Sequence, residues 1–237
     1  MTIKLENLTK IYNADGDYPV HAVQSVDLEI KQGEFVAIMG PSGSGKTTLL
    51  NMIGGIDAPS SGKVEIDGCM ISSMSEKELI AYRRDNIGFI FQDYGLLPVL
   101  TALENVEFVM QLQGKTEREC RERATSLLEQ VGLAEQMNKV PGKMSGGQQQ
   151  RVAVARALAP KPRFVMADEP TANLDAKSTA ELLDIMEQLS EQEGTTFIFS
   201  THDSRVIKRA HRIIVFEDGR LARDFSNIDN RAERSHA

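Results

Sequence analysis

Apolar and polar positions along the chain predict an α/β protein in which strands and helices alternate. Glycine, asparagine and aspartate residues separate the apolar stretches, as expected of turns between strands. The predicted elements are strands at 3–8, 21–30 and 35–39, a helix from about Lys46, a strand at 63–66 and, after Pro160, a strand at 164–167, a helix at 176–193, a strand at 196–200 and a helix from Asp203. A last hairpin turns at Asp218 and Gly219.

The middle of the chain is predicted to be helical. Three capping boxes, in which a Ser or Thr precedes a Glu by three residues, open helices there: Ser75 with Glu78, Thr101 with Glu104, and Thr116 with Glu119. The domain organisation that follows is an α/β core at about 1–92 and 160–226, an inserted helical subdomain at about 93–159 and a polar tail at 227–237.

Composition narrows the class of protein. The 237 residues are 41% hydrophobic and 26% charged, which is typical of a soluble globular protein. The longest apolar run covers residues 35–39, far short of the ~18 residues of a membrane span. Residues 1–7 lack the pattern of a secretion signal, and Cys69 and Cys120 match no metal or disulfide spacing, so we expect a reducing cytoplasm. The net charge of −7 argues against general nucleic-acid binding.

A glycine-rich segment after the strand at 35–39 carries the strongest chemical signal. Residues 40–47 read Gly-Pro-Ser-Gly-Ser-Gly-Lys-Thr and match the P-loop pattern G-x-x-x-x-G-K-[ST]. In such a loop, backbone N–H groups surround phosphates, Lys46 reaches the β and γ phosphates, and Thr47 holds Mg²⁺. The predicted nucleotide-binding positions are Gly40, Ser42, Gly43, Ser44, Gly45, Lys46, Thr47 and Thr48.

Two adjacent acids end the apolar strand at 164–167. Open α/β sheets bind ligands at the carboxyl ends of their strands, and neighbouring side chains on a strand point to opposite sides. Asp168 and Glu169 can therefore have different roles. We expect Asp168 to support Mg²⁺ and Glu169 to polarise the attacking water, as general base or as a positioning group.

A second helix start carries two glycines. Ser145 and Gln148 form a capping box that opens a helix at 149–159, with Gly146 and Gly147 inside its first turn. Each glycine costs a helix about 1 kcal/mol, so close approach by a ligand explains the pair better than helix stability does. A helix N-terminus with a serine hydroxyl is a second candidate phosphate site.

In the order in which they occur, these motifs make the chain resemble an ATP-binding-cassette (ABC) ATPase over nearly its whole length. The signature Ser-Gly-Gly-Gln stands at 145–148, preceded by Met144 where the family mostly has leucine. The resemblance implies a P-loop NTPase fold, with a RecA-like core, an antiparallel β subdomain and an inserted α-helical subdomain. It also implies hydrolysis of ATP with Mg²⁺ as the metal.

The same resemblance assigns roles to further residues. Tyr12 is similar to the aromatic residue that stacks on adenine, and Gln92 to the loop glutamine that contacts Mg²⁺ and water. Asp175 stands in a segment similar to the loop that crosses between subunits, and His202 is similar to the switch histidine that binds the γ phosphate. The implied catalytic set is Lys46, Gln92, Glu169 and His202, and the implied Mg²⁺ ligands are Thr47, Gln92 and Asp168.

Within the family, the stretches at 42–57, 88–106 and 168–175 are similar to the lipoprotein-releasing, macrolide-exporter and cell-division ATPases (LolD, MacB and FtsE). This likeness implies a second copy of the chain that closes around two ATP, and an integral membrane permease that docks in a groove near Gln92 to Leu103. It implies the cytoplasmic face of the bacterial inner membrane as the location, and no nucleic acid as a partner. The expected work is export or extraction of a lipoprotein, lipid, peptide or drug.

Three alternatives stay open. An FtsE-like ATPase would signal across the membrane without moving a cargo. An ABC ATPase that works on DNA or ribosomes is expected to carry long coiled-coil heptads or a second cassette, which this sequence lacks. A P-loop small-molecule kinase is expected to lack the helix that follows Ser145 and the partner acid Glu169. The resemblance implies that the permease, and not this chain, selects the cargo.

Overall fold

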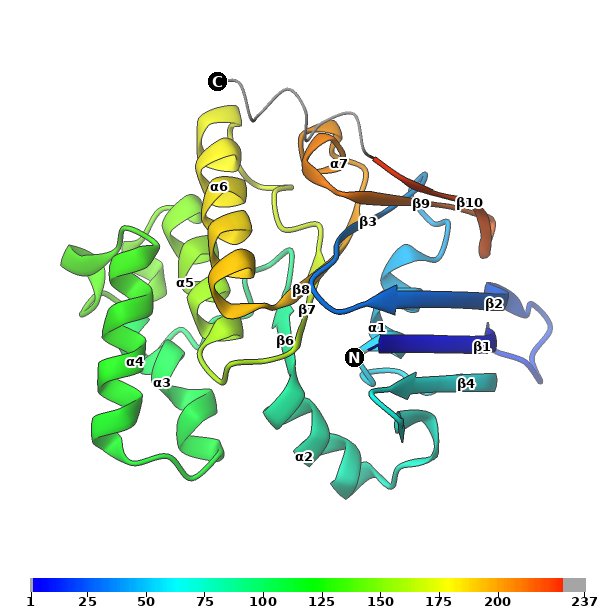
Figure 1. The fold of residues 1–237 in the computed structure, drawn as a ribbon, viewed down its shortest axis with the longest axis horizontal. Helices are drawn as coiled ribbons and strands as arrows, with labels where there is room; N and C mark the ends of the chain where they lie inside the picture. Colours follow the sequence, from blue (N-terminus) through cyan, green and yellow to red (C-terminus); the bar gives the residue numbers. More distant parts are fainter. Residues whose placement is uncertain (1, 228–237) are drawn as a thin grey trace. The chain divides into compact units, whose positions relative to one another are not determined.

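The computed structural model describes residues 2–227, which form two compact units (Figure 1). The first unit consists of residues 2–80 and 196–227, and the second of residues 81–195. The helical subdomain predicted at 93–159 falls inside the second unit. Of the tail predicted at 227–237, all but Asn227 lies outside the described residues.

An antiparallel sheet in the first unit has the strand order β2-β1-β4-β5 and consists of β1 (Thr2–Tyr12), β2 (Val20–Lys31), β4 (Ser61–Ile66) and β5 (Cys69–Met70). Figure 1 shows β2, β1 and β4 side by side. In β1, Ile3, Leu5 and Leu8 are buried, so the alternation slips by one residue between Leu5 and Leu8. Asn7 has a left-handed φ of 47° and lies in the bulge that returns Leu8 to the buried face.

Parallel strands in the first unit position the segment at 40–47. β3 (Phe35–Met39) lies between β8 (Thr196–Thr201) and β9 (Arg212–Glu217), and β10 (Arg220–Ser226) pairs with β9 in antiparallel. β3 is followed by α1 (Lys46–Ile53), and β8 by α7 (Ser204–Arg209). The predicted hairpin turn is confirmed, because Asp218 and Gly219 have φ of 46° and 76°, the left-handed pair that a type I′ turn requires.

In the second unit, two short parallel strands accompany a group of helices that stand together in Figure 1. The strands are β6 (Ile87–Ile90) and β7 (Phe164–Asp168), and the helices are α3 (Ala102–Leu112), α4 (Glu117–Gln130), α5 (Gly146–Leu158) and α6 (Ala176–Glu193). α4 buries Cys120, Ala124, Leu127 and Leu128, a stripe at i, i+4, i+7 and i+8, and packs on α3 and α5. The unit boundary falls within α2 (Glu76–Asn86), which buries none of its residues.

Short 3₁₀ turns link these elements, and most of the predicted helix starts are confirmed. The turns are η1 (Ile71–Ser73), η2 (Ala134–Gln136) and η3 (Pro141–Lys143). The capping boxes at Thr101, Thr116 and Ser145 each show both reciprocal hydrogen bonds, and Ser75 and Glu78 exchange the same pair of bonds at the start of α2.

Two predictions from the sequence are wrong in detail. The strand β6 at 87–90 was not predicted from the sequence pattern. Four residues between a helix and a loop are too few to show a period. The helix predicted at 149–159 begins at Gly146 and ends at Leu158. It starts earlier because Ser145 is the N-cap, which makes the next residue the first helical one.

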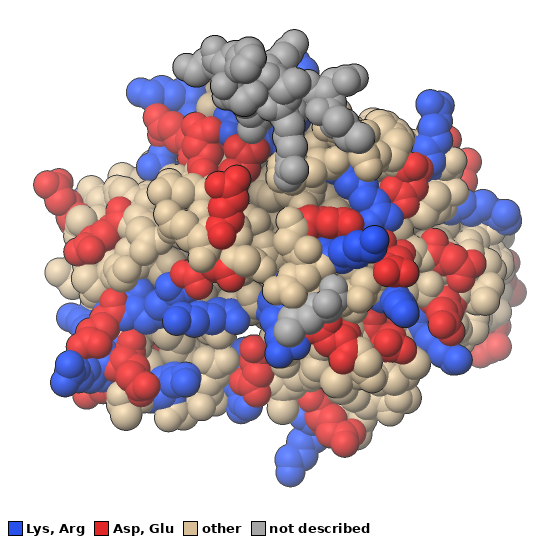
Figure 2. Space-filling model, viewed as in Figure 1, with Lys and Arg blue, Asp and Glu red and all other residues tan. Residues whose placement is uncertain are grey.

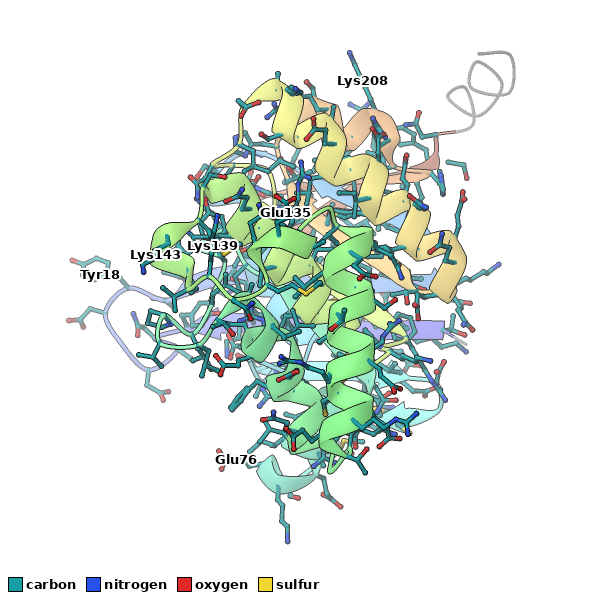
Figure 3. All side chains as sticks on the ribbon, turned by 90° about the vertical axis from the view of Figure 1, so that its left-hand side faces the viewer. Tyr18, Glu76, Glu135, Lys139, Lys143 and Lys208 are labelled. Carbon is teal, nitrogen blue, oxygen red and sulfur yellow. The ribbon has the colours of Figure 1, made fainter. Side chains whose placement is uncertain are left out.

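Charged side chains of both signs are interspersed over the face of the molecule seen in Figure 2. Side chains that project from the surface in Figure 3 include Tyr18, on the loop between β1 and β2, and Glu135, Lys139 and Lys143, on the segment between α4 and α5. Tyr18 is 84% exposed. None of the helices within residues 2–227 has both the length and the apolar character needed to cross a membrane.

Candidate functional site

The loop between β3 and α1 leaves its helix start without a side-chain cap. The N-cap of α1 is Gly45, with a left-handed φ of 100°, whereas α3, α4 and α5 begin with complete capping boxes. The first N–H groups of a helix have no partner within the helix, and a helix start without a side-chain cap is a common position for a bound anion. Lys46 is buried beside the loop and donates to the carbonyl oxygens of Gly40 and Pro41 at 3.0 and 2.9 Å.

Glycines in this loop meet two different constraints. A Cβ on Gly40 would lie 2.0 Å from the carbonyl oxygen of Phe216, and one on Gly45 would lie 2.1 Å from that of Ala22, so backbone from elsewhere fills both positions. Gly43 has a φ of 79° and nothing within 4 Å of the corresponding point. Gly40 and Gly45 are therefore required by packing, whereas the open side of Gly43 is accessible to a ligand.

Two other predicted residues of the first unit stand near this loop or at the same sheet edge. Thr201 pairs with Met39 across the parallel strands, so His202 and Gly40 leave neighbouring strands at the same edge. Tyr12 is the last residue of β1, and its hydroxyl donates to Asp57 at 2.5 Å. The backbone N–H of Asp57 donates to the carbonyl of Asn51 in α1 at 3.2 Å. The ring of Tyr12 is thereby fixed beside the helix that carries Lys46.

In the second unit, Gln92, Asp168 and Glu169 leave the same edge of a parallel pair of strands. Ile90 of β6 pairs with Ala167 of β7, and the three predicted residues follow directly. Glu169 has a left-handed φ of 44°, which a residue with a side chain rarely adopts. Backbone strain of this kind concentrates at functional sites.

The signature segment at 145–148 forms the start of α5. The Ser145 hydroxyl accepts a hydrogen bond from the backbone N–H of Gln148 at 3.3 Å, and the Gln148 side chain accepts one from the N–H of Ser145 at 3.1 Å. The N–H groups of Gly146 and Gly147 are not used by this box. A Cβ on Gly146 would lie 2.7 Å from the Tyr94 hydroxyl, so a tyrosine side chain fills that position.

Asp175 has a local structural role in the described chain. It is the N-cap of α6 and accepts hydrogen bonds from the N–H and the hydroxyl of Ser178 at 2.9 and 2.8 Å. These two bonds hold the pKa of Asp175 below its usual value. The carboxylate is thus charged at neutral pH, and it lies two residues after Asn173, whose side-chain amide donates to the carbonyl of Gln92 at 3.2 Å.

Comparison with known proteins decides the family. A family model described as "ABC transporter" matches residues 23–172, a range that includes the loop at 40–47, the signature at 145–148 and the acids at 168–169. The chain belongs to the ABC transporter ATP-binding family. As a member of it, this cassette binds ATP and is an ATPase.

Relatives of the cassette align over most of its length. An uncharacterized ABC transporter ATP-binding protein of Methanocaldococcus jannaschii, MJ0796, is 46% identical over 226 residues, which cover 94% of this chain and 96% of the relative. The uncharacterized ABC transporter ATP-binding protein YknY of Bacillus subtilis is 46% identical over 92% of this chain and 93% of its own length. The macrolide export ATP-binding/permease protein MacB of Rhodopirellula baltica is 42% identical over 98% of this chain, which spans only 34% of MacB.

Solved structures confirm the predicted fold class. A dimeric structure of MJ0796 in a post-hydrolysis state, bound to ADP and Pi, superposes with a TM-score of 0.88 at 44% identity and covers 94% of this chain and 98% of its own. The P-loop fold with an antiparallel sheet and helical additions, which the resemblance implied, is the fold of this cassette.

One residue of the cassette that sequence reasoning missed is Arg156, on α5. Its guanidinium donates to the carbonyl oxygen of Tyr94 at 2.9 Å and to that of Gly95. Tyr94 has a left-handed φ of 61°, and burial lowers the pKa of Arg156. The loop after Gln92 is therefore fixed to the helix that starts at Gly146. A single arginine in the apolar run 152–158 was the available signal in the sequence.

The two kinds of glycine in the phosphate loop predict opposite mutant phenotypes. Gly40→Ala should lower the free energy of unfolding by about 2 kcal/mol or more, because its methyl group meets a backbone oxygen that cannot move aside. Gly43→Ala should cost only about 1 kcal/mol of left-handed strain but weaken ADP binding, because its methyl group enters the open side of the loop. Urea unfolding and ADP titration measure both effects. Equal unfolding midpoints for the two variants would contradict this assignment.

Proposed function

We propose that the chain is the ATP-hydrolysing subunit of a transporter in which two copies close around two Mg·ATP and drive a membrane permease. The uncapped glycine loop before α1 supports the nucleotide site. The dimeric structures of MJ0796 support the pairing. The name of MacB joins an ATP-binding part and a permease in one protein, which supports a permease as partner and the cytoplasmic face of the membrane as the location.

The first unit would hold the nucleotide. Lys46 would exchange its bonds to loop carbonyls for bonds to the β and γ phosphates, and the adenine would stack on Tyr12. The hydroxyl of Thr47, the amide of Gln92 and the carboxylate of Asp168 are oxygen donors of the kind Mg²⁺ prefers, so this set fits that metal. When bound, Mg²⁺ would neutralise charge on the phosphates.

Hydrolysis would rest on groups at the carboxyl ends of the strands. Glu169 would accept a proton from, or orient, the water that attacks the γ phosphate, because its carboxylate follows β7 directly in a constrained backbone. Gln92 would orient the same water. His202 would donate a hydrogen bond to the γ phosphate oxygens and so stabilise the charge that develops on them.

The signature helix would complete the site of the second copy. The side chain of Ser145 and the free N–H groups of Gly146 and Gly147 form a second anion site in one chain. When two copies meet, each can give its signature to the ATP held by the other, and such an interface is isologous and closes as a dimer. Gln148 would support Ser145 through the capping box, and Asp175 would approach the other copy.

The permease would dock on the segment that follows Gln92. Leu97 is 39% and Val99 83% exposed, whereas Leu100 is partly buried, so Leu97 and Val99 are the side chains that a partner can reach. Asn105 is fully buried and binds the backbone of this segment, accepting from Leu97 N–H at 2.8 Å and donating to the carbonyls of Leu97 and Leu100. An exposed apolar surface on a rigid support suits an amphipathic helix from a partner.

One prediction of this proposal concerns hydrolysis. Glu169→Gln should still bind ATP but hydrolyse it about 10²-fold or more slowly, since a positioned base contributes on that scale. Lys46→Ala should instead lose ATP binding. Steady-state turnover and equilibrium binding separate the two effects. A Glu169→Gln variant that turns over at the unmodified rate would remove Glu169 from the reaction.

Another prediction of this proposal concerns the dimer. Glu169→Gln with ATP should dimerise in light scattering, and adding Ser145→Arg should abolish this by placing bulk and positive charge at the shared site. Ser145 is also a helix cap, so Thr116→Ala in the same background serves as the control that loses an equivalent cap on α4. Dimerisation that survives Ser145→Arg, or is lost equally with Thr116→Ala, speaks against the sandwich.

The last prediction of this proposal concerns the permease. Val99→Glu should leave the isolated chain folded and active, because the side chain is largely exposed, but should abolish co-purification with the membrane partner in detergent. Leu97→Glu tests the neighbouring position. Tyr18→Glu, at 84% exposure on the β1–β2 loop, is the matched control and should retain the partner. Full retention of the partner by a folded Val99→Glu variant would contradict the docking site.

A further inference from the structure

Three side chains at the end of β1 form a closed cluster. The ammonium of Lys10 lies 4.9 Å from the centroid of the Tyr12 ring and donates to Asp57 Oδ1 at 2.6 Å. The Tyr12 hydroxyl donates to the other carboxylate oxygen, Asp57 Oδ2, at 2.5 Å. Lys10 and Tyr12 are two residues apart on one strand, so their side chains share a face, while Asp57 comes from the segment after α1.

The segment that supplies Asp57 is itself fixed at both ends. The backbone N–H of Asp57 donates to the carbonyl of Asn51 in α1 at 3.2 Å, and the ammonium of Lys10 also donates to the carbonyl of Ala58 at 2.7 Å. The N–H of Ser60 donates to the carbonyl of Thr9 in β1 at 2.8 Å. The cluster therefore ties the Tyr12 ring to α1, the helix that begins with Lys46.

The charge states of the cluster suit this arrangement. Burial raises the pKa of Asp57, but the hydrogen bonds from Lys10 and Tyr12 outweigh it, so the pKa lies below its usual value and the group is a carboxylate. Burial, together with the bond to Asp57, raises the pKa of Tyr12, which keeps its hydroxyl protonated and able to donate. The side chains of Lys10 and Asp57 are 14% and 26% exposed, so water competes little for their ion pair.

We infer that Lys10 and Asp57 are positioning residues that hold the Tyr12 ring as a pre-oriented stacking platform for the base of the nucleotide. This inference rests on the stacking role proposed for Tyr12 above. Lys10 lies over one face of the ring, and Tyr12 as a whole remains 38% exposed, so part of the residue is open to a ligand. Ordering a mobile side chain on binding weakens affinity, so a ring that is already fixed binds the base more tightly.

The inference separates binding of the base from binding of the phosphates. Lys10→Met and Asp57→Asn should weaken ADP binding about threefold to tenfold, the scale of ordering one side chain, and leave inorganic pyrophosphate binding within about twofold. Tyr12→Phe, which keeps the ring and loses the hydroxyl, should behave like Asp57→Asn. Lys10→Arg should largely restore ADP binding, because a guanidinium can also lie over the ring and bind the carboxylate. Calorimetric titration of the full chain with each ligand and Mg²⁺ measures these affinities.

Matched variants decide the interpretation. Lys63→Met removes an exposed ion pair with Glu6 in the same sheet and should change neither affinity. If Lys10→Met and Asp57→Asn weaken ADP and pyrophosphate equally, the cluster supports the phosphate loop and the inference is wrong. If they change neither while Tyr12→Ala weakens ADP alone, the ring stacks without support, and the inference is again wrong. If Tyr12→Ala itself leaves ADP binding unchanged, the stacking role proposed for Tyr12 fails first.

Discussion

The phosphate loop depends on two positions where no side chain fits. The backbone of the loop passes so close to the carbonyls of Phe216 and Ala22 that Gly40 and Gly45 have no alternative. Phe216 belongs to β9 and Ala22 to β2, so the loop is pressed against a strand of each sheet of the first unit. The turn between β9 and β10 also binds the loop, because the N–H of Gly219 donates to the carbonyl of Ser44. The carbonyl of Gly219 accepts from the N–H of Gln24 in β2. A loop fixed in this way presents its N–H groups in place before any ligand binds.

The second unit is organised around the loop that follows Gln92. Arg156 and Asn173 bind carbonyls of this loop from α5 and from the segment before α6, while Asn105 of α3 binds the next few residues. The exposed apolar side chains on the loop thus stand on a support that also carries the signature glycines.

The sequence predicted those parts of the site in which chemistry forces a contiguous pattern. A loop that binds phosphates through its backbone needs several glycines in a row, so residues 40–47 are recognisable without a structure. The supports of the site are not contiguous. Asp57 meets Tyr12 from 45 residues away and Arg156 meets Tyr94 from 62 residues away, and no local period connects such pairs. Tertiary folding alone brings them together.

Glu169 shows why a strained residue can indicate function. The chain turns sharply after β7, with the N–H of Ala172 donating to the carbonyl of Glu169 at 3.2 Å, and Glu169, the first residue of this turn, has a left-handed φ of 44°. Glycine would adopt that conformation without the cost of about 1 kcal/mol that a Cβ imposes. Glycine carries no carboxylate, however. A glutamate at this position lowers the stability of the fold and puts an acid at the carboxyl end of a buried strand, which is the position that the proposed hydrolysis needs.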